Sequence, residues 1–254
     1  LRFSRSEAVT RPLEVVSGPA TLASGVTLTA PDGSDAAWSL ELGDGAEFKF
    51  TDITARLSLP VDVAITGSGK FAFAKGSPTA RGLVVARSVT TNGVALAKGR
   101  YALADGIVSG STGSSLVIPY RWTGAGGNAS FDDADNWEGG VVPPSGLNTP
   151  VDLSAATRVE IAGDYSLTSV VYLPTGANRE ATLAVDGTLS LVTDEDDWYG
   201  CATYVKEGCR LALDAKVIQR GDTKGPMSMI GGGTVAAKGD FPGLLWTDGV
   251  VNYL

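Results

Sequence analysis

The densest group of carboxylates in this chain is the run Asp194-Glu195-Asp196-Asp197. Calcium binds six to eight oxygen atoms, which clustered carboxylates can supply, so Asp194, Asp196 and Asp197 are candidate ligands. The spacing matches neither an EF-hand loop nor a Gly-Gly-x-Gly-x-Asp repeat, and a solvated turn is the other interpretation. The same two interpretations apply to a second acidic group, Asp132, Asp133 and Asp135. We expect no obligatory cofactor, with Ca²⁺ as the candidate metal.

Aromatic residues follow the first acidic run directly. Aromatic faces stack on sugar rings, and neighbouring carboxylates accept hydrogen bonds from sugar hydroxyls, so this composition suits carbohydrate binding. In the other interpretation the rings pack over the structure beneath them and the acids face water. The candidate glycan contacts are Trp198, Tyr199, Tyr204 and Trp246.

The chain has two cysteines, Cys201 and Cys209, which lie close to these aromatic residues. The short segment between them predicts a disulfide, which would fit an oxidising compartment. Two unlinked thiols on neighbouring strands of a reduced protein are the alternative.

Several kinds of catalytic site are excluded by residue type. The chain contains no His, which removes Ser–His–Asp and Cys–His systems and every His-ligated metal site. It also lacks a Gly-x-Ser-x-Gly elbow, a phosphate loop and a dinucleotide fingerprint. A polysaccharide lyase using Lys or Arg beside calcium stays as an alternative, with the candidate bases Lys206, Arg210, Arg220 and Lys224. We expect the protein not to be an enzyme.

Charge and hydropathy limit the partners. With 20 Lys+Arg and 28 Asp+Glu the net charge is −8, which disfavours a nucleic-acid partner. No stretch approaches the ~20 apolar residues of a membrane span. The chain begins at Leu1 without an apolar leader, which suggests a piece of a longer polypeptide.

Short β-strands must position these residues. Helical periodicity is almost absent, and alternating runs rich in Val, Leu, Thr and Phe are separated by Gly, which predicts an all-β protein. Examples are Glu47-Phe-Lys-Phe50, Lys70-Phe-Ala-Phe73 and Arg210-Leu-Ala-Leu213.

These runs also repeat. One apolar anchor per run gives a spacing of roughly 22 residues with one interruption, as stacked coils of a β-solenoid would produce. The anchors are Leu28, Phe48, Phe71, Leu96 and Leu116, then Leu167, Leu189, Leu211 and Val235. We predict a right-handed parallel β-helix in which each strand pairs with its equivalent in the next coil. A β-sandwich with strands at regular spacing is the alternative.

The interruption is rich in Trp, Gly and acidic residues. It contains Trp122-Thr-Gly124, Asn136-Trp137, Gly140, Pro143 and Asp152. These residues resemble the W-T-G … N-W … G … P … D segment of large bacterial surface and secreted proteins of the autotransporter-type, β-helical repeat class. The segments Thr91–Tyr101 and Gly110–Ile118 are similar to the coil-ending pattern of the same proteins. The acidic Asp132-Asp133-Ala134-Asp135 departs from the family, where Ser and Thr are more usual.

The resemblance covers about residues 89–152 and implies an extracellular, modular, usually non-enzymatic context, without a catalytic residue to carry over. We expect a β-helical module with a coil-ending cap over 1–118, a joining segment over 119–150 and a second β-helical module over 151–254. Trp122 and Trp137 should close a hydrophobic cap over the open end of the first module, because an exposed terminal coil offers unpaired backbone. A sugar-stacking platform is the other interpretation of these two rings.

The expected function is that of a non-catalytic module in a larger secreted or cell-surface bacterial protein, serving as a rigid, adhesin-like spacer or display element that also contacts glycans. The alternatives are a carbohydrate-binding module attached to a polysaccharide-degrading enzyme and, third, a β-helical lyase or glycosidase. The expected partners are polysaccharide and the rest of the larger polypeptide, and the expected location is extracellular or the bacterial cell surface.

Overall fold

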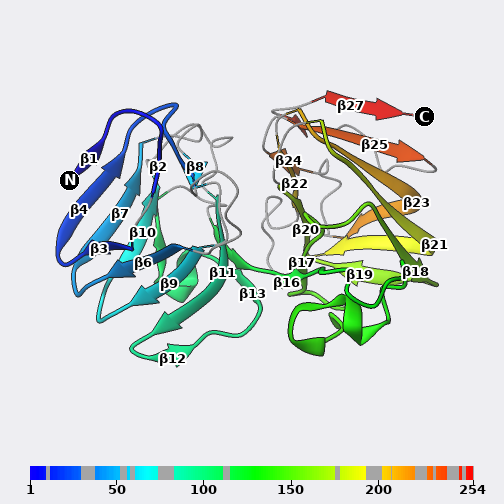
Figure 1. Cartoon of the computed structure of the whole chain (residues 1–254), viewed down its shortest axis with the longest axis horizontal. Helices are drawn as coiled ribbons and strands as arrows, with labels where there is room; N and C mark the ends of the chain where they lie inside the picture. Colours follow the sequence, from blue (N-terminus) through cyan, green and yellow to red (C-terminus); the bar gives the residue numbers. More distant parts are fainter. Residues whose placement is uncertain are drawn as a thin grey trace. The chain divides into compact units, whose positions relative to one another are not determined.

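The structure is a computed structural model. It describes residues 1–9, 12–29, 38–51, 56–57, 61–73, 83–110, 115–174, 178–192, 202–206, 208–220, 228–230, 233–238, 246–247 and 250–253. The chain divides into two compact units, Leu1–Ile118 and Pro119–Leu254 (Figure 1). Besides strands, the described residues hold three short 3-10 helices, Leu103–Asp105, Ala134–Asn136 and Glu138–Gly140. None of the helices in this part of the chain is long and apolar enough to cross a membrane.

The first unit consists of stacked coils whose successive strands belong to three different sheets. The first sheet has the order β1 (Arg2–Phe3), β4 (Gly18–Leu22), β7 (Ala46–Phe50), β10 (Lys70–Phe73) and β14 (Val108–Ser109). The second contains β3 (Leu13–Val15), β6 (Trp38–Leu42), β9 (Val61–Ile65), β11 (Leu83–Thr91) and β15 (Ser115–Ile118), all paired in parallel. The third is β2 (Glu7–Ala8), β5 (Thr27–Thr29) and β8 (Arg56–Leu57).

Two further strands of the first unit run antiparallel. β12 (Val94–Ala95) pairs with β11, and β13 (Gly99–Tyr101) pairs with β15 at the end of the second sheet. The backbone of β13 therefore covers the edge at which the stack of coils stops.

The second unit is built in the same way. One sheet has the order β16 (Tyr120–Arg121), β17 (Pro150–Asp152), β20 (Ser169–Tyr172), β22 (Ala202–Val205), β24 (Ser228–Ile230) and β26 (Trp246–Thr247). The other contains β18 (Arg158–Ala162), β21 (Glu180–Val192), β23 (Arg210–Arg220), β25 (Thr234–Lys238) and β27 (Val250–Tyr253), with β19 (Tyr165–Leu167) also beside β21. The six strands of the first of these sheets correspond to about six turns.

The protein is therefore an all-β solenoid with stacked parallel sheets, as predicted. The β-sandwich alternative is wrong, because the sheets of a sandwich are antiparallel. Among the described strands, only β12 and β13 pair antiparallel.

The predicted repeat is correct in some coils and wrong in others. Phe48 pairs with Phe71, and Leu211 pairs with Val235, as the anchors required. Leu28 belongs instead to the third sheet of the first unit, where it pairs with Glu7 and Leu57. Each coil contributes strands to more than one sheet, so a single anchor per run cannot say which sheet the run joins.

Leu96 is a second misplaced anchor. It follows the antiparallel β12, and its N–H donates to the carbonyl of Val89 at 2.9 Å. In the second unit Leu167 pairs with Leu191, two positions beyond the anchor Leu189. Both errors arise where the chain leaves the regular coil or bends. There the spacing of apolar residues along the sequence no longer predicts which residues pair between strands.

The interior of each unit is a ladder of apolar side chains. Along β7, Ala46, Phe48 and Phe50 are buried, while Glu47 and Lys49 point outward and form an ion pair at 2.7 Å. The ring of Phe50 stacks on Phe73 of the next coil with centroids 4.8 Å apart. Alternation along a strand thus becomes a column of rings across strands, because parallel pairing brings equivalent positions together.

The turns are also connected from coil to coil. The Oδ1 atom of Asp44 accepts hydrogen bonds from the N–H of Ser68 at 2.9 Å and from its hydroxyl at 2.8 Å. These bonds hold the pKa of Asp44 below its ordinary value. One coil further, the N–H of Gly67 donates to Oδ1 of Asn92 at 2.8 Å.

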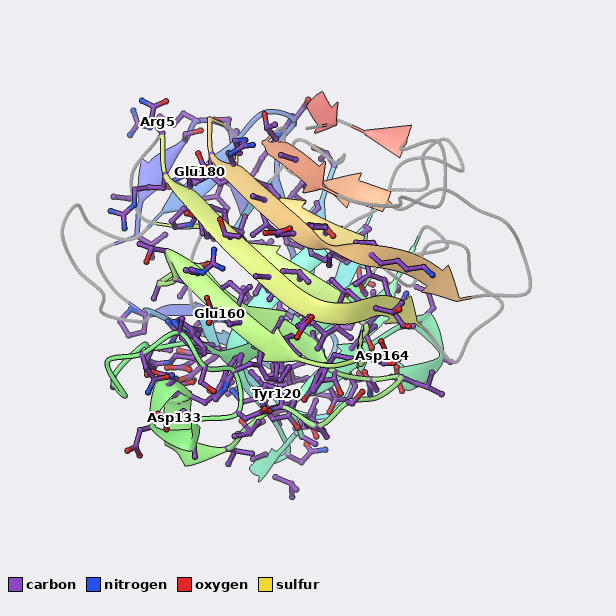
Figure 2. The ribbon with its side chains drawn as sticks, turned by 90° about the vertical axis from the view of Figure 1, so that its right-hand side faces the viewer. Arg5, Tyr120, Asp133, Glu160, Asp164 and Glu180 are labelled. Atoms are coloured by element: carbon purple, nitrogen blue, oxygen red, sulfur yellow. The ribbon has the colours of Figure 1, made fainter. Side chains whose placement is uncertain are left out.

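A bend in β21 turns the corner between two faces of the second unit. The register shifts between Ala184 and Thr188, and Gly187 has φ 153°. A Cβ atom on Gly187 would lie 2.6 Å from the carbonyl carbon of Gly163 in the neighbouring coil. Asp164 lies at this corner (Figure 2), and its Oδ1 accepts the N–H of Thr188 at 2.7 Å.

Replacing Phe48 by Ala should destabilise the first unit strongly. The ring is fully buried and contacts Phe3, Phe50 and Phe71, so its removal leaves a cavity worth about 3–5 kcal/mol. Denaturant unfolding followed by circular dichroism measures the loss. The matched control is Lys49→Ala on the outward face, which should cost less than about 1 kcal/mol. Equal losses in the two variants would contradict the assigned inward and outward positions.

Candidate functional site

Aromatic and polar side chains converge in the segment that interrupts the repeat. Four rings form an aromatic cap: Trp122, Phe131, Trp137 and Tyr165. The indoles of Trp122 and Trp137 meet edge to face with centroids 5.2 Å apart, and Phe131 lies 4.7 Å from Trp137 and 4.8 Å from Tyr165. Trp137 Nε1 donates to the carbonyl of Phe131 at 2.7 Å, which satisfies the one polar atom of a buried indole.

The aromatic cap belongs to the core of the second unit. Trp122, Phe131 and Trp137 are at most 5% exposed and lie in one apolar cluster with Val151 and Val159. The prediction placed Trp122 and Trp137 over the end of the first module, and this assignment is wrong. The sugar-stacking interpretation fails as well, because neither indole presents a face to solvent.

Backbone pairing explains why the cap covers the start of the second unit. The N–H of Phe131 donates to the carbonyl of Glu160 at 2.8 Å, and the N–H of Glu160 donates to the carbonyl of Ala129 at 2.7 Å. Ser130 therefore forms an isolated parallel bridge with Glu160 of β18. The segment supplies the neighbour that β18 would otherwise lack and places Phe131 above the core.

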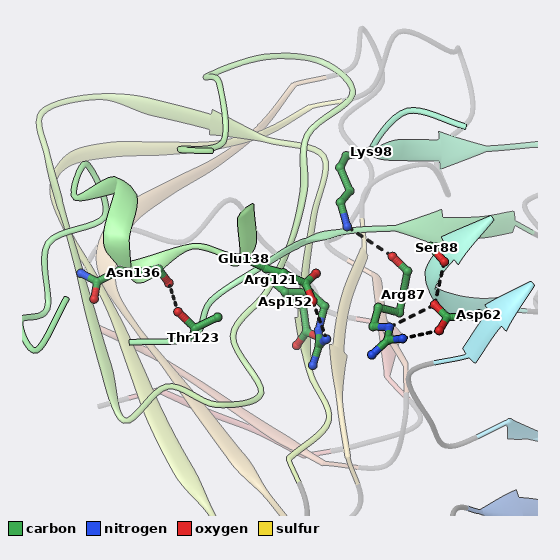
Figure 3. A network of polar contacts seen from close by, with 9 residues as sticks. All are labelled: Asp62, Arg87, Ser88, Lys98, Arg121, Thr123, Asn136, Glu138 and Asp152. Atoms are coloured by element: carbon green, nitrogen blue, oxygen red, sulfur yellow. Dashed lines mark hydrogen bonds and ion pairs between the residues drawn. The ribbon is translucent and has the colours of Figure 1, made fainter. Parts of the chain in front are cut away.

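Asn136 organises the loop from inside. Its side chain is fully buried, and Nδ2 donates to Asn128 Oδ1 at 2.9 Å and to the carbonyl of Ser130 at 3.0 Å. Its Oδ1 accepts the N–H of Gly126 at 3.0 Å. The backbone carbonyl of Asn136 accepts the N–H of Thr123 at 2.7 Å, and the hydroxyl of Thr123 also donates to it (Figure 3). One amide thus joins three parts of the loop.

One acidic residue of this segment, Asp133, bonds within the loop. Asp133 Oδ1 accepts the N–H of Asp135 at 3.0 Å and caps the 3-10 helix Ala134–Asn136. Hydrogen bonds, first from Asn128 and then from the Asp135 backbone, lower the pKa of Asp133. Asp132, Asp133 and Asp135 do not converge, and the described part of the chain contains no group of three acidic, Cys or His side chains able to hold a metal ion.

A partly buried ion pair lies at the first strands of this unit (Figure 3). Arg121 Nε lies 3.6 Å from Asp152 Oδ2, and Arg121 Nη1 lies 3.2 Å from Glu138 Oε1. The side chain of Asp152 is 13% exposed, and its Oδ1 accepts the N–H of Ser154 at 2.8 Å and the Ser154 hydroxyl. Burial raises the pKa of Asp152 above its ordinary value, although Ser154 and Arg121 act in the opposite direction.

The side chain of Tyr165 connects the loop to β19, the strand on which it lies. Its hydroxyl donates to the carbonyl of Pro143, and burial together with the charge of Asp132 raises its pKa to about 12. The phenol therefore stays protonated and acts as a donor throughout the physiological range. The chemistry of the segment is structural: it fixes a loop over an apolar end.

The candidate glycan contacts are not brought together among the described residues. Tyr204 lies on β22 and is 4% exposed, so the prediction that its ring stacks on a sugar is wrong. The side chains of Thr203, Tyr204 and Val205 on β22 are all buried. Trp198 and Tyr199 lie outside the described residues, as does the side chain of Trp246 at the start of β26.

The other predicted sites fall in two groups. Asp194, Asp196, Asp197 and Cys201 lie outside the described residues, while Cys209 is buried. There is no disulfide among the described residues, and the Cys201–Cys209 bond stays a prediction. Of the proposed lyase bases, Lys206 Nζ donates to the carbonyl of Pro174 at 3.0 Å and Arg210 is paired with Glu180.

Sequence reasoning did not single out Phe131, Asn136 or the Arg121–Asp152 pair. Asn136 directly precedes Trp137 in the quoted motif, so the signal was present but was assigned to the family pattern and not to a hydrogen-bonding role. Phe131 carried no spacing signal, because it lies in a loop with neither strand nor helix periodicity.

Comparisons with protein-family models, curated proteins and solved structures give no match. The class of protein that the fold defines is a β-solenoid with an aromatic loop at the start of its second unit. The likeness to surface-protein repeats stays a resemblance of motifs.

Replacing Asn136 by Ala should destabilise the second unit. The substitution leaves buried partners without their hydrogen bonds, and each unsatisfied group costs about 1–3 kcal/mol. Thermal or denaturant unfolding measures the loss. Asp135→Ala is the control, because that side chain is exposed and should change stability by less than about 0.5 kcal/mol. An Asn136→Ala protein as stable as the control would exclude the organising role.

The contributions of Asp152 and Asp44 to the free energy of unfolding should change with pH in opposite directions. The pKa of Asp152 is raised by folding, so its contribution to stability is full below the unfolded pKa and declines as the pH rises through the folded one. The pKa of Asp44 is lowered, so its contribution is present above the unfolded pKa and is lost as the pH falls through the folded one.

Unfolding free energies of the wild type, Asp152→Asn and Asp44→Asn between acid and neutral pH test this pair. On lowering the pH the wild type should gain stability relative to Asp152→Asn and lose it relative to Asp44→Asn. Differences of the same sign in both comparisons would refute the assigned environments.

Proposed function

We propose that this chain is a non-catalytic, rigid spacer or display module of a larger secreted or cell-surface bacterial protein. The proposal rests on the hydrogen bonds that polar side chains on the outside of the coils make to neighbouring coils. Asp44, Asn92 and Asp164 each accept a hydrogen bond from the backbone of a neighbouring coil. Side chains that could have faced a ligand instead hold successive turns together.

Stacking of this kind supports a spacer on physical grounds. Each coil is bonded to the next through parallel ladders, through the apolar interior and through the turns, so bending requires several contacts to break together. The length grows by about 4.8 Å per coil, the spacing of neighbouring strands. Stability grows with each added coil as well, because repeat proteins gain from nearest-neighbour contacts and not from one specialised centre.

The cell-surface context is supported by the resemblance of Trp122-Thr-Gly124 and Asn136-Trp137 to segments of bacterial surface proteins. In this chain these residues form the structural cap described above. We propose that glycan contact, where it occurs, involves Trp198, Tyr199 or Trp246. A carbohydrate-binding module is the competing function, and the two are separated by binding measurements.

Duplication of one coil should lengthen the first unit by one strand spacing. Phe48 and Phe71 are equivalent, so a second copy of residues 47–69 inserted after Gly69 adds one complete coil of 71 − 48 = 23 residues. Thr21, Lys49, Ala72 and Ser109 lie in one column across four strands. Spin labels at Thr21 and Ser109 should therefore move from about 14 Å to about 19 Å between backbones, as three strand spacings become four.

Dipolar broadening in electron paramagnetic resonance measures this change, in a Cys201→Ser, Cys209→Ala background. The control is a flexible Gly/Ser insertion of the same length after Gly69, which should loop out and leave no ordered increase. A folded duplicated variant with an unchanged or broad distance would count against an extensible stack.

Affinity gels and arrays of polysaccharides test the competing function. A spacer should show no retention that depends on Trp198→Ala or Trp246→Ala, and retention lost in either variant would replace it by a carbohydrate-binding module. Incubation with uronate-containing polysaccharides should give a flat absorbance trace, and the appearance of unsaturated products would indicate a lyase.

A further inference from the structure

The hairpin between β11 and β12 in the first unit has a two-residue turn, Asn92-Gly93 (Figure 1). Thr91 pairs with Val94 across this turn, and Asn92 and Gly93 have φ of 51° and 80°. Positive φ at both central residues is typical of the type I′ turn of a tight hairpin. Both turn residues are exposed. No other Asn in the sequence is followed by Gly.

The neighbouring coil holds Asn92 by two hydrogen bonds. The backbone N–H of Asn92 donates to the carbonyl of Ile65 at 2.8 Å, and its Oδ1 accepts the N–H of Gly67 at 2.8 Å. Neither Asn92 Nδ2 nor the N–H of Gly93 donates a hydrogen bond to a described residue. The side-chain carbonyl is therefore fixed and polarised by a backbone donor, while the backbone nitrogen that follows it is unbonded.

These groups are the reactants of intramolecular deamidation. The backbone nitrogen of Gly93 bonds to Cγ of Asn92 and gives up its proton, and Nδ2 leaves with that proton as ammonia, which closes a succinimide ring. Water then opens the ring at either carbonyl. Opening at Cγ leaves an ordinary aspartate, and opening at the other carbonyl leaves isoaspartate, in which the main chain runs through Cγ. The sequence of steps consumes water, releases ammonia and needs no oxidant or cofactor.

We propose that Asn92 is a site of covalent modification, deamidated by Gly93 in the folded chain with the N–H of Gly67 assisting. A fixed backbone N–H aimed at an oxygen that gains negative charge lowers the barrier, as in an oxyanion hole. The nucleophile is also accessible, because a Cβ at Gly93 would meet no atom within 4 Å. This modification goes beyond the spacer function and does not depend on it.

Asn178 provides a matched comparison inside the same chain. It is exposed with φ 57°, and its N–H donates to the carbonyl of Gly208 at 3.0 Å, much as that of Asn92 donates to Ile65. The residue that follows it is Arg179, whose side chain hinders closure of the ring. Asn178 should therefore stay intact under conditions in which Asn92 reacts.

The two products should affect the hairpin differently. An aspartate keeps the side-chain oxygens and the length of the turn. Isoaspartate lengthens the main chain between Thr91 and Val94, so their pairing no longer fits a two-residue turn. The hydrogen bond from the N–H of Leu96 to the carbonyl of Val89, 2.9 Å long, should then open. Isoaspartate at this position thus loosens β12 from β11.

Peptide mass spectrometry of the folded 254-residue chain, incubated at mildly alkaline pH, tests the proposal. The mass change of an amide replaced by a carboxyl should appear at Asn92 about tenfold or more faster than at Asn178. Gly93→Asp adds a Cβ and keeps the left-handed turn, which Asp tolerates, so it should slow the reaction about tenfold or more. Circular dichroism verifies that the variant remains folded.

The same measurement in urea separates the folded turn from the sequence alone. Unfolding removes the donor from Gly67, so the rate at Asn92 should fall. A folded chain that reacts more slowly than the unfolded one, or not at all, overturns the proposal, because the fold would then protect Asn92. Equal rates at Asn92 and Asn178 in the folded chain overturn it as well.

Hydrogen exchange tests the effect on the hairpin. An isoaspartyl methyltransferase with S-adenosylmethionine counts the isoaspartate in the aged chain. The amide of Leu96 should exchange faster in chains that carry it, and Asn92→Asp, which has the other product at the same place, should exchange like the fresh protein. Unchanged protection of Leu96 in isoaspartate-containing chains would contradict the loosening of β12.

Discussion

The parallel ladder between successive coils is the constraint on which this structure depends. A strand in such a ladder completes its backbone hydrogen bonds with the coil before it and the coil after it, so no coil is satisfied alone. The ladder also aligns equivalent positions, which is why Phe48 meets Phe71 and Leu211 meets Val235. Turn residues such as Asp44 then add side-chain bonds to the next coil at little cost, because the ladder has already brought them into position.

The same constraint explains the segment between the two units. A new stack needs a first coil with a partner for its leading strand and a cover for its core. Residues around Ser130 supply the partner to β18, and Phe131 with the two indoles supplies the cover. Asn136 is buried inside the loop because an irregular backbone has its own donors and acceptors to satisfy, and one amide can bind several of them. Packing thus accounts for Trp122 and Trp137.

The sequence predicts the fold class well and the site poorly, for physical reasons. Alternation and recurrence are local properties that survive in the sequence, and they identify parallel stacking through pairs such as Phe48 and Phe71. Which sheet a run joins depends on the path of the coil, so Leu28 and Leu96 were misplaced. The prediction that Tyr204 contacts a sugar was wrong for a related reason. The neighbouring acidic residues in the sequence do not indicate whether the strand that holds this ring is buried. Trp122 and Trp137 were predicted to cap the first module, but they pack in the core of the second unit, and proximity along the chain could not say which unit they join.

The stiffness expected of a spacer comes from bonds between coils inside a unit. There a strand such as β7 has a neighbour on both sides, and turn residues such as Asp44 bond to the next coil. A change inside the stack therefore disturbs the backbone ladder, the apolar column and the turn bonds together, because equivalent positions of successive coils form all three.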